Sequence, residues 1–261
     1  MHFRLHVNTY EAVTNIKRLE GQGFQLSTHS NKGKALYEVR FLVLATGGTS
    51  RPRMLNVPGE NLPHVSTSME DPHKYFGRQV LVVGGKNSAV ETALRCYSAG
   101  ARVCLVNRNE QFDSKDIKYW LLPELLGRIE RGELQAFTES KIVEIHQDYV
   151  VLKKREKIME TAADFVIKAI GFEANMELFQ QLGVQLSPEN QSVLHDESMQ
   201  VNIPDVYVLG TAVAGTQQRY RVFIENAHKH VDKIMESISA KLSVPLNWKL
   251  AEQPARSRLE E

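Results

Sequence analysis

Residues 80–108, VLVVGGKNSAVETALRCYSAGARVCLVNR, carry the pattern that decides the fold of this chain. The apolar run VLVV at 80–83 is typical of a buried parallel strand, and two glycines follow it directly. Apolar residues then recur at helical spacing from Ala89 until Gly100, and a second apolar run begins at residue 101. Strand, glycine turn, helix and strand in this order predict a βαβ unit of the kind that binds dinucleotides.

The glycine turn departs at one position from the G-x-G-x-x-G/A pattern of dinucleotide-binding turns. Gly84 and Ala89 match its first and last positions, whereas Lys86 stands where the second glycine belongs. The free amides at the start of the helix, and its positive end, would face a pyrophosphate. The stem of Lys86 must therefore point away from the phosphates, and its ammonium could reach one of them instead. A βαβ unit with a purely structural role is the weaker alternative.

The residues after the second strand indicate which nicotinamide coenzyme would bind. NAD sites usually place Asp or Glu there to accept a hydrogen bond from the ribose 2′-hydroxyl, and an arginine suits the 2′-phosphate of NADP. Here Asn107 and Arg108 follow the strand, and Glu110 comes only later. A guanidinium can bind a phosphate through two parallel hydrogen bonds. The sequence therefore favours NADPH, with a solvated Arg108 as the alternative.

Composition and charge narrow the class of protein. A chain of 261 residues can form one large domain or two modest domains with a real core. Its net charge of +1 gives no electrostatic case for binding nucleic acid or an anionic membrane. No apolar run approaches the roughly 20 residues that span a bilayer, and the first residues, MHFRLHVNTYEAV, lack the pattern of a signal peptide. We therefore expect a cytoplasmic protein.

The cysteines and histidines carry little chemical signal. The chain has two cysteines, Cys96 in the expected helix and Cys104 in the strand after it, and no CxxC. Their number excludes a disulfide scaffold, and core packing is a better expectation for both than a disulfide between them. The nine histidines show no spacing typical of metal ligands, so no metal site is expected.

The rest of the chain gives a coarser pattern. It predicts strand and helix fragments in 1–28, a strand ending at a glycine pair in 35–48, a proline-rich linker in 49–77, helices on either side of Pro123 in 114–134, strands in 141–171, a buried strand in 201–215 and an amphipathic helix over 221–242. Strands and helices thus alternate along the chain, which favours an α/β fold.

Three separated segments together resemble a known family. FLVLATGG (41–48), VLVVGGKNSAVETAL (80–94) and ADFVIKAIGFEAN with VNIPDVYVLGTAVAG (163–175 and 201–215) resemble the two-dinucleotide-binding flavoprotein reductases of the thioredoxin-reductase type. More narrowly, VGGKNSAVE, KYWLLPE and FIEN resemble the bacillithiol-disulfide-reductase-like (YpdA-type) flavoproteins, in which a lysine in the glycine turn is usual. The resemblance extends over roughly residues 5–235.

The resemblance implies where the cofactors would bind. It implies an α/β fold in which a Rossmann-like, three-layer (β/β/α) NADPH domain, residues 67–174, is inserted into an FAD-type domain formed by 1–66 and 175–261. Implied contacts to NADPH come from Gly84, Gly85, Lys86, Asn87, Ser88, Ala89, Glu91, Asn107, Arg108, Ile170 and Gly171. Implied contacts to FAD come from Thr46, Gly47, Gly210, Thr211, and a helix starting near Val222 that includes Phe223 and Ile224. No catalytic side chain is implied, because the cofactors carry the hydride transfer.

Three departures from the family pattern limit what the resemblance implies. The first strand and glycine loop, which hold the ADP half of FAD in the family, are not in this sequence, so we expect an N-terminally truncated FAD-type domain. The redox CxxC of thioredoxin reductases is replaced by VSTSMEDPH at 65–73, so a dithiol relay to thioredoxin is not expected. Thr211 stands where the family usually has an aspartate that contacts the flavin.

The function implied is that of an NADPH-dependent flavoprotein oxidoreductase. Hydride would pass from NADPH to FAD, and electrons would pass on to a low-molecular-weight disulfide. A module that binds NADPH without flavin turnover is one alternative, and a flavin monooxygenase is a weaker one. A small-molecule disulfide is the expected partner; nucleic acid and membrane are not expected, and homo-oligomerisation is left open.

Overall fold

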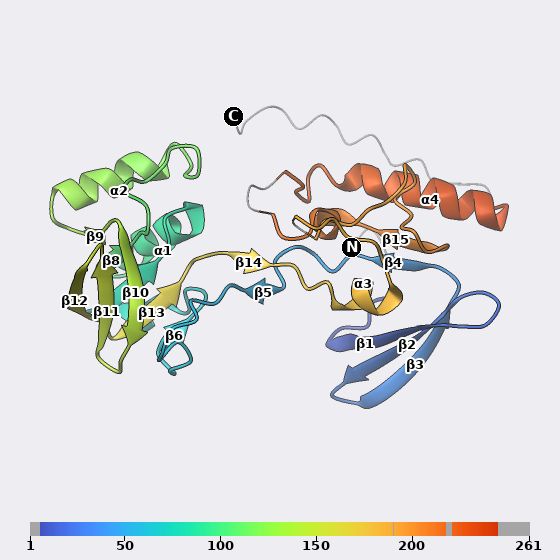
Figure 1. Cartoon of the computed structure of the whole chain (residues 1–261), viewed down its shortest axis with the longest axis horizontal. Coiled ribbons are helices and arrows are strands. Elements are labelled where there is room, and N and C mark those ends of the chain that lie inside the picture. Colours follow the sequence, from blue (N-terminus) through green and yellow to red (C-terminus); the bar gives the residue numbers. More distant parts are fainter. Residues whose placement is uncertain (1–5, 190, 218–220, 245–261) are drawn as a thin grey trace. The chain divides into compact units, whose positions relative to one another are not determined.

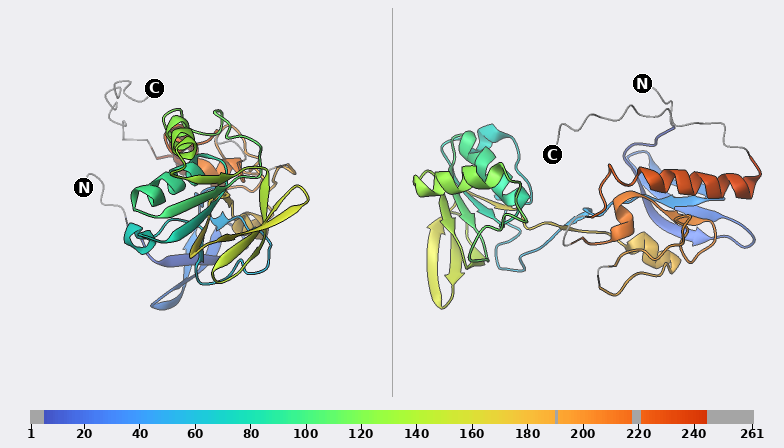
Figure 2. Two further views of the ribbon diagram at one scale, coloured as in Figure 1. Left: turned by 90° about the vertical axis from the view of Figure 1, so that its left-hand side faces the viewer. Right: turned by 90° about the horizontal axis from the view of Figure 1, so that it is seen from above.

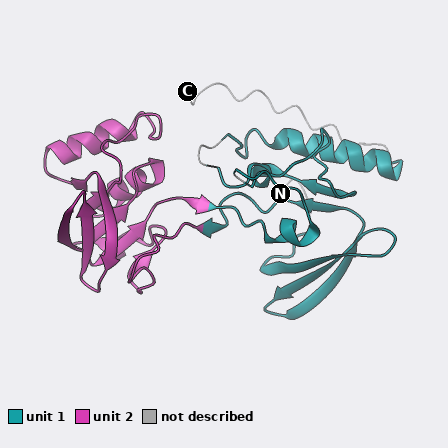
Figure 3. Cartoon of the chain, in the orientation of Figure 1, with its two compact units in different colours: residues 1–51, 173–261 teal, residues 52–172 magenta. Residues whose placement is uncertain are grey.

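In the computed structural model, which describes residues 6–189, 191–217 and 221–244, the chain forms two compact units (Figure 3). The outer unit comprises residues 1–51 and 173–261, and the inserted unit comprises residues 52–172. One hydrophobic core lies in the outer unit, and two cores lie in the inserted unit.

The inserted unit is organised around a sheet of five parallel strands in the order β6-β13-β7-β8-β9 (Figure 1). The register pairs Val83 with both Val106 and Lys168, so the three central strands end at one edge of the sheet. Ligands of open parallel sheets bind at this carboxyl edge. The strands are β6 (Val65–Ser66), β7 (Gln79–Val83), β8 (Arg102–Val106), β9 (Gln135–Phe137) and β13 (Phe165–Lys168).

Two different layers cover the faces of this sheet (Figure 2). The helices α1 (Asn87–Ser98) and α2 (Leu121–Glu130) pack on one face, and an antiparallel sheet packs on the other. Along β7, Val80 and Val82 belong to the core beneath the helices, whereas Leu81 belongs to the opposite core. This confirms the predicted three-layer, Rossmann-like α/β arrangement. The antiparallel strands are β10 (Ser140–Ile145), β11 (Tyr149–Lys154) and β12 (Lys157–Ala162).

The two cysteines lie in opposite cores of the inserted unit. Cys96 packs in the core beneath the helices, and Cys104 packs in the core beneath the antiparallel sheet. Both thiols are free, which confirms that packing rather than a disulfide explains them. Burial raises the pKa of the Cys96 thiol to about 11 and that of the Cys104 thiol to about 12. Neither is therefore a reactive thiolate near neutral pH.

The outer unit combines a three-stranded antiparallel sheet with a short parallel pair and two helices. Its elements are β1 (Glu11–Arg18), β2 (Phe24–Ser30), β3 (Gly33–Val39), β4 (Leu42–Leu44), α3 (Glu177–Leu182), β15 (Val206–Val208), the 3-10 helix η2 (Gly210–Ala214) and α4 (His228–Leu242). The segments that connect the units contain β5 (Arg51–Pro52) and β14 (Phe172–Glu173), which pair with each other, and a 3-10 helix, η1 (Pro72–Tyr75), precedes β7. None of the helices in the described ranges combines the length and the apolar run needed to cross a bilayer.

The predicted amphipathic helix near the end of the chain begins later than its apolar pattern indicates. Helix α4 starts at His228. Upstream, the side chain of Gln217 accepts a hydrogen bond from the amide of Val222 at 3.0 Å, and that of Asn226 accepts one from the amide of Phe223 at 2.8 Å. These side chains satisfy the backbone in a non-helical conformation, so the apolar residues there do not extend the helix.

Two other sequence predictions also need correction. The described part of residues 1–28 contains a β1–β2 hairpin without a helix, in a register that pairs Arg18 with Phe24. In the segment 114–134 the helix begins only at Leu121, and Pro123 lies in its first turn, where the amides have no intrahelical acceptor. The residues before it form turns.

The boundaries of the units differ from the predicted domain boundaries. The chain passes between the units after Arg51 and again after Phe172, rather than after residues 66 and 174. Residues 52–66 belong to the inserted unit because β6 pairs with β13 in its sheet. That the inserted unit binds NADPH and the outer unit FAD stays a prediction at this point.

A buried ion pair also ties the segment before β6 to the central sheet. Lys168, the last residue of β13, places its Nζ 2.7 Å from Oε1 of Glu60, and each side chain is 4% exposed. Glu60 also accepts hydrogen bonds from the amides of Leu55 at 2.5 Å and Asn56 at 2.8 Å. The carboxylate thus organises a loop and neutralises a lysine inside the fold.

Candidate functional site

The turn between β7 and α1 brings three segments into close contact. Gly84 has a φ of +139° and donates its amide to the carbonyl of Val106 at 2.9 Å. A Cβ on Gly84 would lie 2.4 Å from the carbonyl oxygen of Ala169 and 2.8 Å from Cβ of Ala89. Only glycine fits this position, both for its backbone conformation and for its contacts.

The start of α1 offers free hydrogen-bond donors at the carboxyl edge of the sheet. Within the described residues, the amides of Gly85, Lys86 and Ser88 have no acceptor in the chain, whereas the amide of Asn87 donates to the carbonyl of Asp116 at 3.2 Å. The partial positive charge at the N-terminal end of this helix adds to the attraction that the free amides exert on an anion. The turn therefore has the donors and the absence of side-chain bulk at Gly84 that a pyrophosphate requires.

The side chains of Lys86 and Asn87 both reach the segment that precedes α2. Nζ of Lys86 lies 3.1 Å from Oδ2 of Asp116, and Oδ1 of Asn87 accepts a hydrogen bond from the amide of Lys118 at 2.6 Å. The stem of Lys86 thus points toward this segment. The side chain of Asn87 is hydrogen-bonded to the same segment.

Asn107 has a structural role that the sequence does not reveal. It is 2% exposed, its Nδ2 donates to the carbonyl of Gln111 at 3.2 Å, and its Oδ1 accepts from the amide of Asn109 at 3.1 Å. A Cβ on Gly85 would meet Oδ1 of Asn107 at 2.3 Å. The Asn107 side chain therefore supports the turn, and its predicted role in binding the coenzyme stays a prediction.

Arg108 follows β8 at the same edge of the sheet. Its side chain is exposed, and no carboxylate in the described part of the chain pairs with it. A free guanidinium at this position matches the predicted recognition of a 2′-phosphate.

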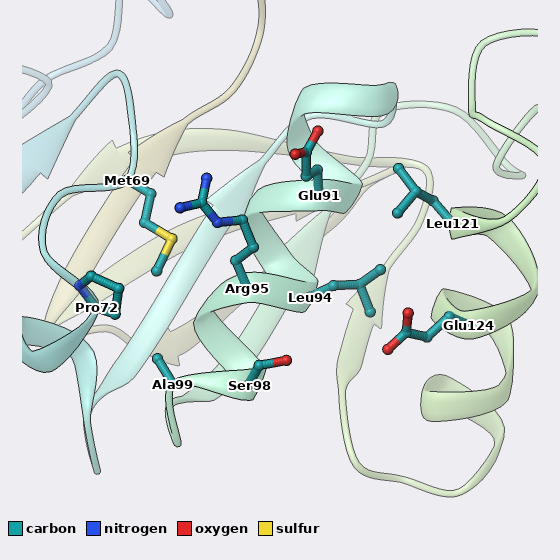
Figure 4. A pocket seen from close by; sticks show the side chains of 9 residues that line it. All are labelled: Met69, Pro72, Glu91, Leu94, Arg95, Ser98, Ala99, Leu121 and Glu124. Atoms are coloured by element: carbon teal, nitrogen blue, oxygen red, sulfur yellow. The ribbon is translucent and has the colours of Figure 1, made fainter. Parts of the chain in front are cut away.

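Two adjoining recesses open next to the turn. The smaller, of about 270 Å³, is lined by three predicted coenzyme residues, Ser88, Glu91 and Gly171. The larger, of about 480 Å³, lies over α1, between the segment at Met69 and the first turn of α2 (Figure 4). Met69, Glu91 and Arg95 line both recesses, so they form a continuous groove.

The residues predicted to bind the coenzyme differ in whether they line this groove. The Ala89 side chain is fully buried and packs closely against Gly84, and the predicted contact of this residue with the coenzyme stays a prediction. The side chain of Ile170 packs with the core beneath the antiparallel sheet, which leaves Gly171 to line the smaller recess. The sequence analysis missed Arg95, which lines both recesses, and Asp116, which pairs with Lys86 beside the turn. The spacing of Glu91 and Arg95, four residues apart on one helix face, was the available signal for the first.

The predicted flavin residues of the outer unit come together from distant parts of the sequence. The parallel pair β4–β15 ends with Leu44 opposite Val208, and the backbone turns at a glycine after each of the two strands. A Cβ on Gly47 would lie 3.8 Å from Oγ1 of Thr211, which places Thr46 and Gly47 beside Gly210 and Thr211.

Phe223 and Ile224 are exposed and precede α4 by several residues. The expected helix start near Val222 is therefore wrong, whereas the predicted contact of Phe223 and Ile224 with a flavin stays a prediction. The helix end lies at His228 instead.

Comparison with known proteins identifies the family. Residues 1–210 match the family model described as pyridine nucleotide-disulphide oxidoreductase. This chain belongs to that family. The structure of bacillithiol disulfide reductase Bdr (YpdA) from Bacillus cereus is similar, with a TM-score of 0.84 and 31% identity, over 90% of this chain and 72% of that one. The resemblance found in the sequence is thus confirmed.

Two curated relatives give the extent of the match. Bacilliredoxin reductase Bdr of Bacillus subtilis (strain 168) is 32% identical over 208 residues, which are 79% of this chain and 64% of the relative. A ferredoxin–NADP reductase of Oceanobacillus iheyensis is 29% identical over 208 residues, 77% of this chain and 60% of the relative. The chain therefore spans less than two thirds of the length of these relatives.

Proposed function

We propose that this chain acts as an NADPH-dependent flavoprotein oxidoreductase that passes hydride from NADPH to FAD and electrons on to a low-molecular-weight disulfide. The observation that carries the proposal is the turn at Gly84, where free amides meet the positive end of α1 at the carboxyl edge of a parallel sheet. Membership of the pyridine nucleotide-disulphide oxidoreductase family supports the same coenzyme class.

The glycine turn, the end of β8 and the groove beside them suggest how NADPH would be held. The amides of Lys86 and Ser88 would bind the pyrophosphate, and Arg108 the 2′-phosphate. Glu91 and Gly171, in the smaller recess, would take the nicotinamide ribose. When bound, NADPH supplies a hydride and FAD accepts it, so the protein contributes binding, orientation and charge rather than an acid or base.

The outer unit supports FAD binding in part. Thr46, Gly47, Gly210 and Thr211 meet at the end of the β4–β15 pair and would contact the flavin side of FAD. In the described ranges, the only strand, glycine turn and α-helix in succession is the one at Gly84. No described residues are therefore assigned to the ADP half of FAD.

The identity of the electron acceptor is the most specific part of the proposal. One relative is a bacilliredoxin reductase and another a ferredoxin–NADP reductase, so the relatives differ in what they reduce. We favour a small disulfide because the similar solved structure is a bacillithiol disulfide reductase. Cys96 and Cys104 are too buried to exchange with it. Two free thiols also suit the cytoplasm, where we place the protein. The relatives give no support to a monooxygenase.

Anaerobic spectroscopy tests this function. The purified chain, incubated with FAD and freed of excess by gel filtration, should show flavin absorption that NADPH bleaches and that a small disulfide such as bacillithiol disulfide restores. A colourless protein that binds NADPH in calorimetry would support the alternative, a binding module without turnover. Absence of NADPH binding would refute both.

Arg108 provides a test of coenzyme choice. Arg108→Ala should raise the Kd for NADPH about tenfold or more and leave the Kd for NADH within about twofold, because only NADPH carries the phosphate that the guanidinium binds. Arg155→Ala is the matched control, since Arg155 is an exposed arginine of the same unit that pairs with Glu139. Equal losses for both coenzymes would contradict the assignment of the 2′-phosphate to Arg108.

A further inference from the structure

Lys86 presents a problem that the G-x-G-x-x-G pattern of dinucleotide-binding turns normally avoids. It occupies the second glycine position of the turn, and its own amide is one of those that would bind a pyrophosphate. Its backbone is extended, with φ −114° and ψ −176°, and its side chain forms no cap on α1. A long cationic side chain therefore starts at the mouth of the proposed site.

Asp116 decides where the Lys86 ammonium rests in this structure. The two charged groups are 3.1 Å apart, and the side chains are 55% and 23% exposed for Lys86 and Asp116. Two further bonds hold the Asp116 segment against the turn, from the amide of Asn87 to the carbonyl of Asp116 and from the amide of Lys118 to Oδ1 of Asn87. The carboxylate is thus anchored through its backbone, so it does not follow the lysine if the lysine moves.

We propose that Asp116 is a positioning residue that competes with the coenzyme pyrophosphate for the Lys86 ammonium. The inference rests on the proposed NADPH site. Binding a pyrophosphate through Lys86 requires the ion pair with Asp116 to break, so part of the attraction between ammonium and phosphate is lost to that step. Asp116 in this way lowers the affinity for the coenzyme and favours its release after hydride transfer.

The substitution Asp116→Asn isolates the charge. It keeps the shape of the side chain and the backbone carbonyl that accepts from Asn87, so the segment stays in place. We expect the Kd for NADPH, measured by calorimetry, to fall about threefold to fivefold, the range expected for a partly exposed ion pair. Asp116→Glu restores the carboxylate and should return the Kd toward that of the unaltered protein.

A double-mutant cycle with Lys86→Met separates competition from a general charge effect. Without the ammonium, Asp116→Asn should change the Kd for NADPH by less than about twofold. Adenosine 2′-monophosphate, which has no pyrophosphate, should bind Asp116→Asn and the unaltered chain equally. The result expected is therefore tightening that depends on both Lys86 and the pyrophosphate.

Four outcomes would overturn the inference. Equal tightening in both backgrounds would mean that Asp116 acts only through its own negative charge. Weaker NADPH binding in Asp116→Asn, with unchanged circular dichroism and melting temperature, would mean that the ion pair supports the site. If the unaltered chain bound no NADPH, the proposed function would fail, and this inference with it, whereas normal binding with an inert Asp116→Asn would overturn the inference alone.

Discussion

Replacing Glu60 with alanine is expected to lower the free energy of unfolding by about 3–5 kcal/mol, because it leaves Lys168 as an unpaired charge inside the protein. The two groups are 2.7 Å apart and each side chain is 4% exposed, so water cannot readily replace the lost partner. The amides of Leu55 and Asn56 lose their acceptor as well. Urea unfolding followed by circular dichroism measures the loss.

An exposed ion pair of the same unit serves as control. Glu156 lies 3.4 Å from Lys153 and its side chain is 94% exposed, so Glu156→Ala should change the unfolding free energy by no more than about 0.5 kcal/mol. A loss below about 1 kcal/mol for Glu60→Ala would mean that Lys168 finds water or another partner. Lys168→Met removes the other partner of the ion pair, and Glu60 then keeps the hydrogen bonds from the amides of Leu55 and Asn56.

The carboxylate of Glu60 also makes the free energy of unfolding depend on pH. Burial alone would raise the pKa of Glu60, but hydrogen bonds from Lys168 and from the amides of Leu55 and Asn56 outweigh burial and lower it. The unfolded chain therefore binds this proton more readily than the folded chain. The contribution of Glu60 is fully present above the ordinary glutamate pKa, near 4.3, and is lost as pH falls through the lower folded value. Glu60→Ala should lose this part of the acid dependence.

The parts of the fold that depend on local pattern could be read from the sequence. The apolar run at 80–83, the glycines after it and the helical spacing up to Gly100 describe one continuous βαβ unit, and each of these signals lies within a few residues. The start of α4 could not be read in this way. It depends on hydrogen bonds that the side-chain oxygens of Gln217 and Asn226 accept from backbone amides, which override a helical apolar pattern.

The candidate site shows the same limit. Gly84 and Arg108 are found from the motif, because both lie in one continuous βαβ unit. Asp116 is brought to Lys86 by the fold of the segment before α2, and no spacing rule relates the two. Asn107 is a polar residue at the expected strand end, yet the fold buries it and gives its side chain a structural role that its position in the sequence does not indicate.

Gly84→Ala is expected to lower the free energy of unfolding by about 3 kcal/mol or more. An alanine at a φ of +139° is strained by roughly 1–3 kcal/mol, and its Cβ would overlap the carbonyl oxygen of Ala169 at 2.4 Å, which adds an overpacking cost of similar size. That carbonyl cannot easily withdraw, because the amide of Ala169 is bound to Val83 at 2.9 Å within the sheet. The turn must therefore shift instead.

A shifted turn moves the amides that would hold the pyrophosphate, so Gly84→Ala should also weaken NADPH binding by about a hundredfold, equivalent to two lost hydrogen bonds to a charged group. Gly77→Ala is the matched control: Gly77 also has a positive φ, +69°, but a Cβ there meets nothing within 4 Å. It should destabilise the fold by about 1–2 kcal/mol and leave NADPH binding unchanged. If both variants lost the same stability, backbone strain alone would explain Gly84, and if Gly84→Ala kept its affinity for NADPH, the coenzyme would have to bind away from this turn.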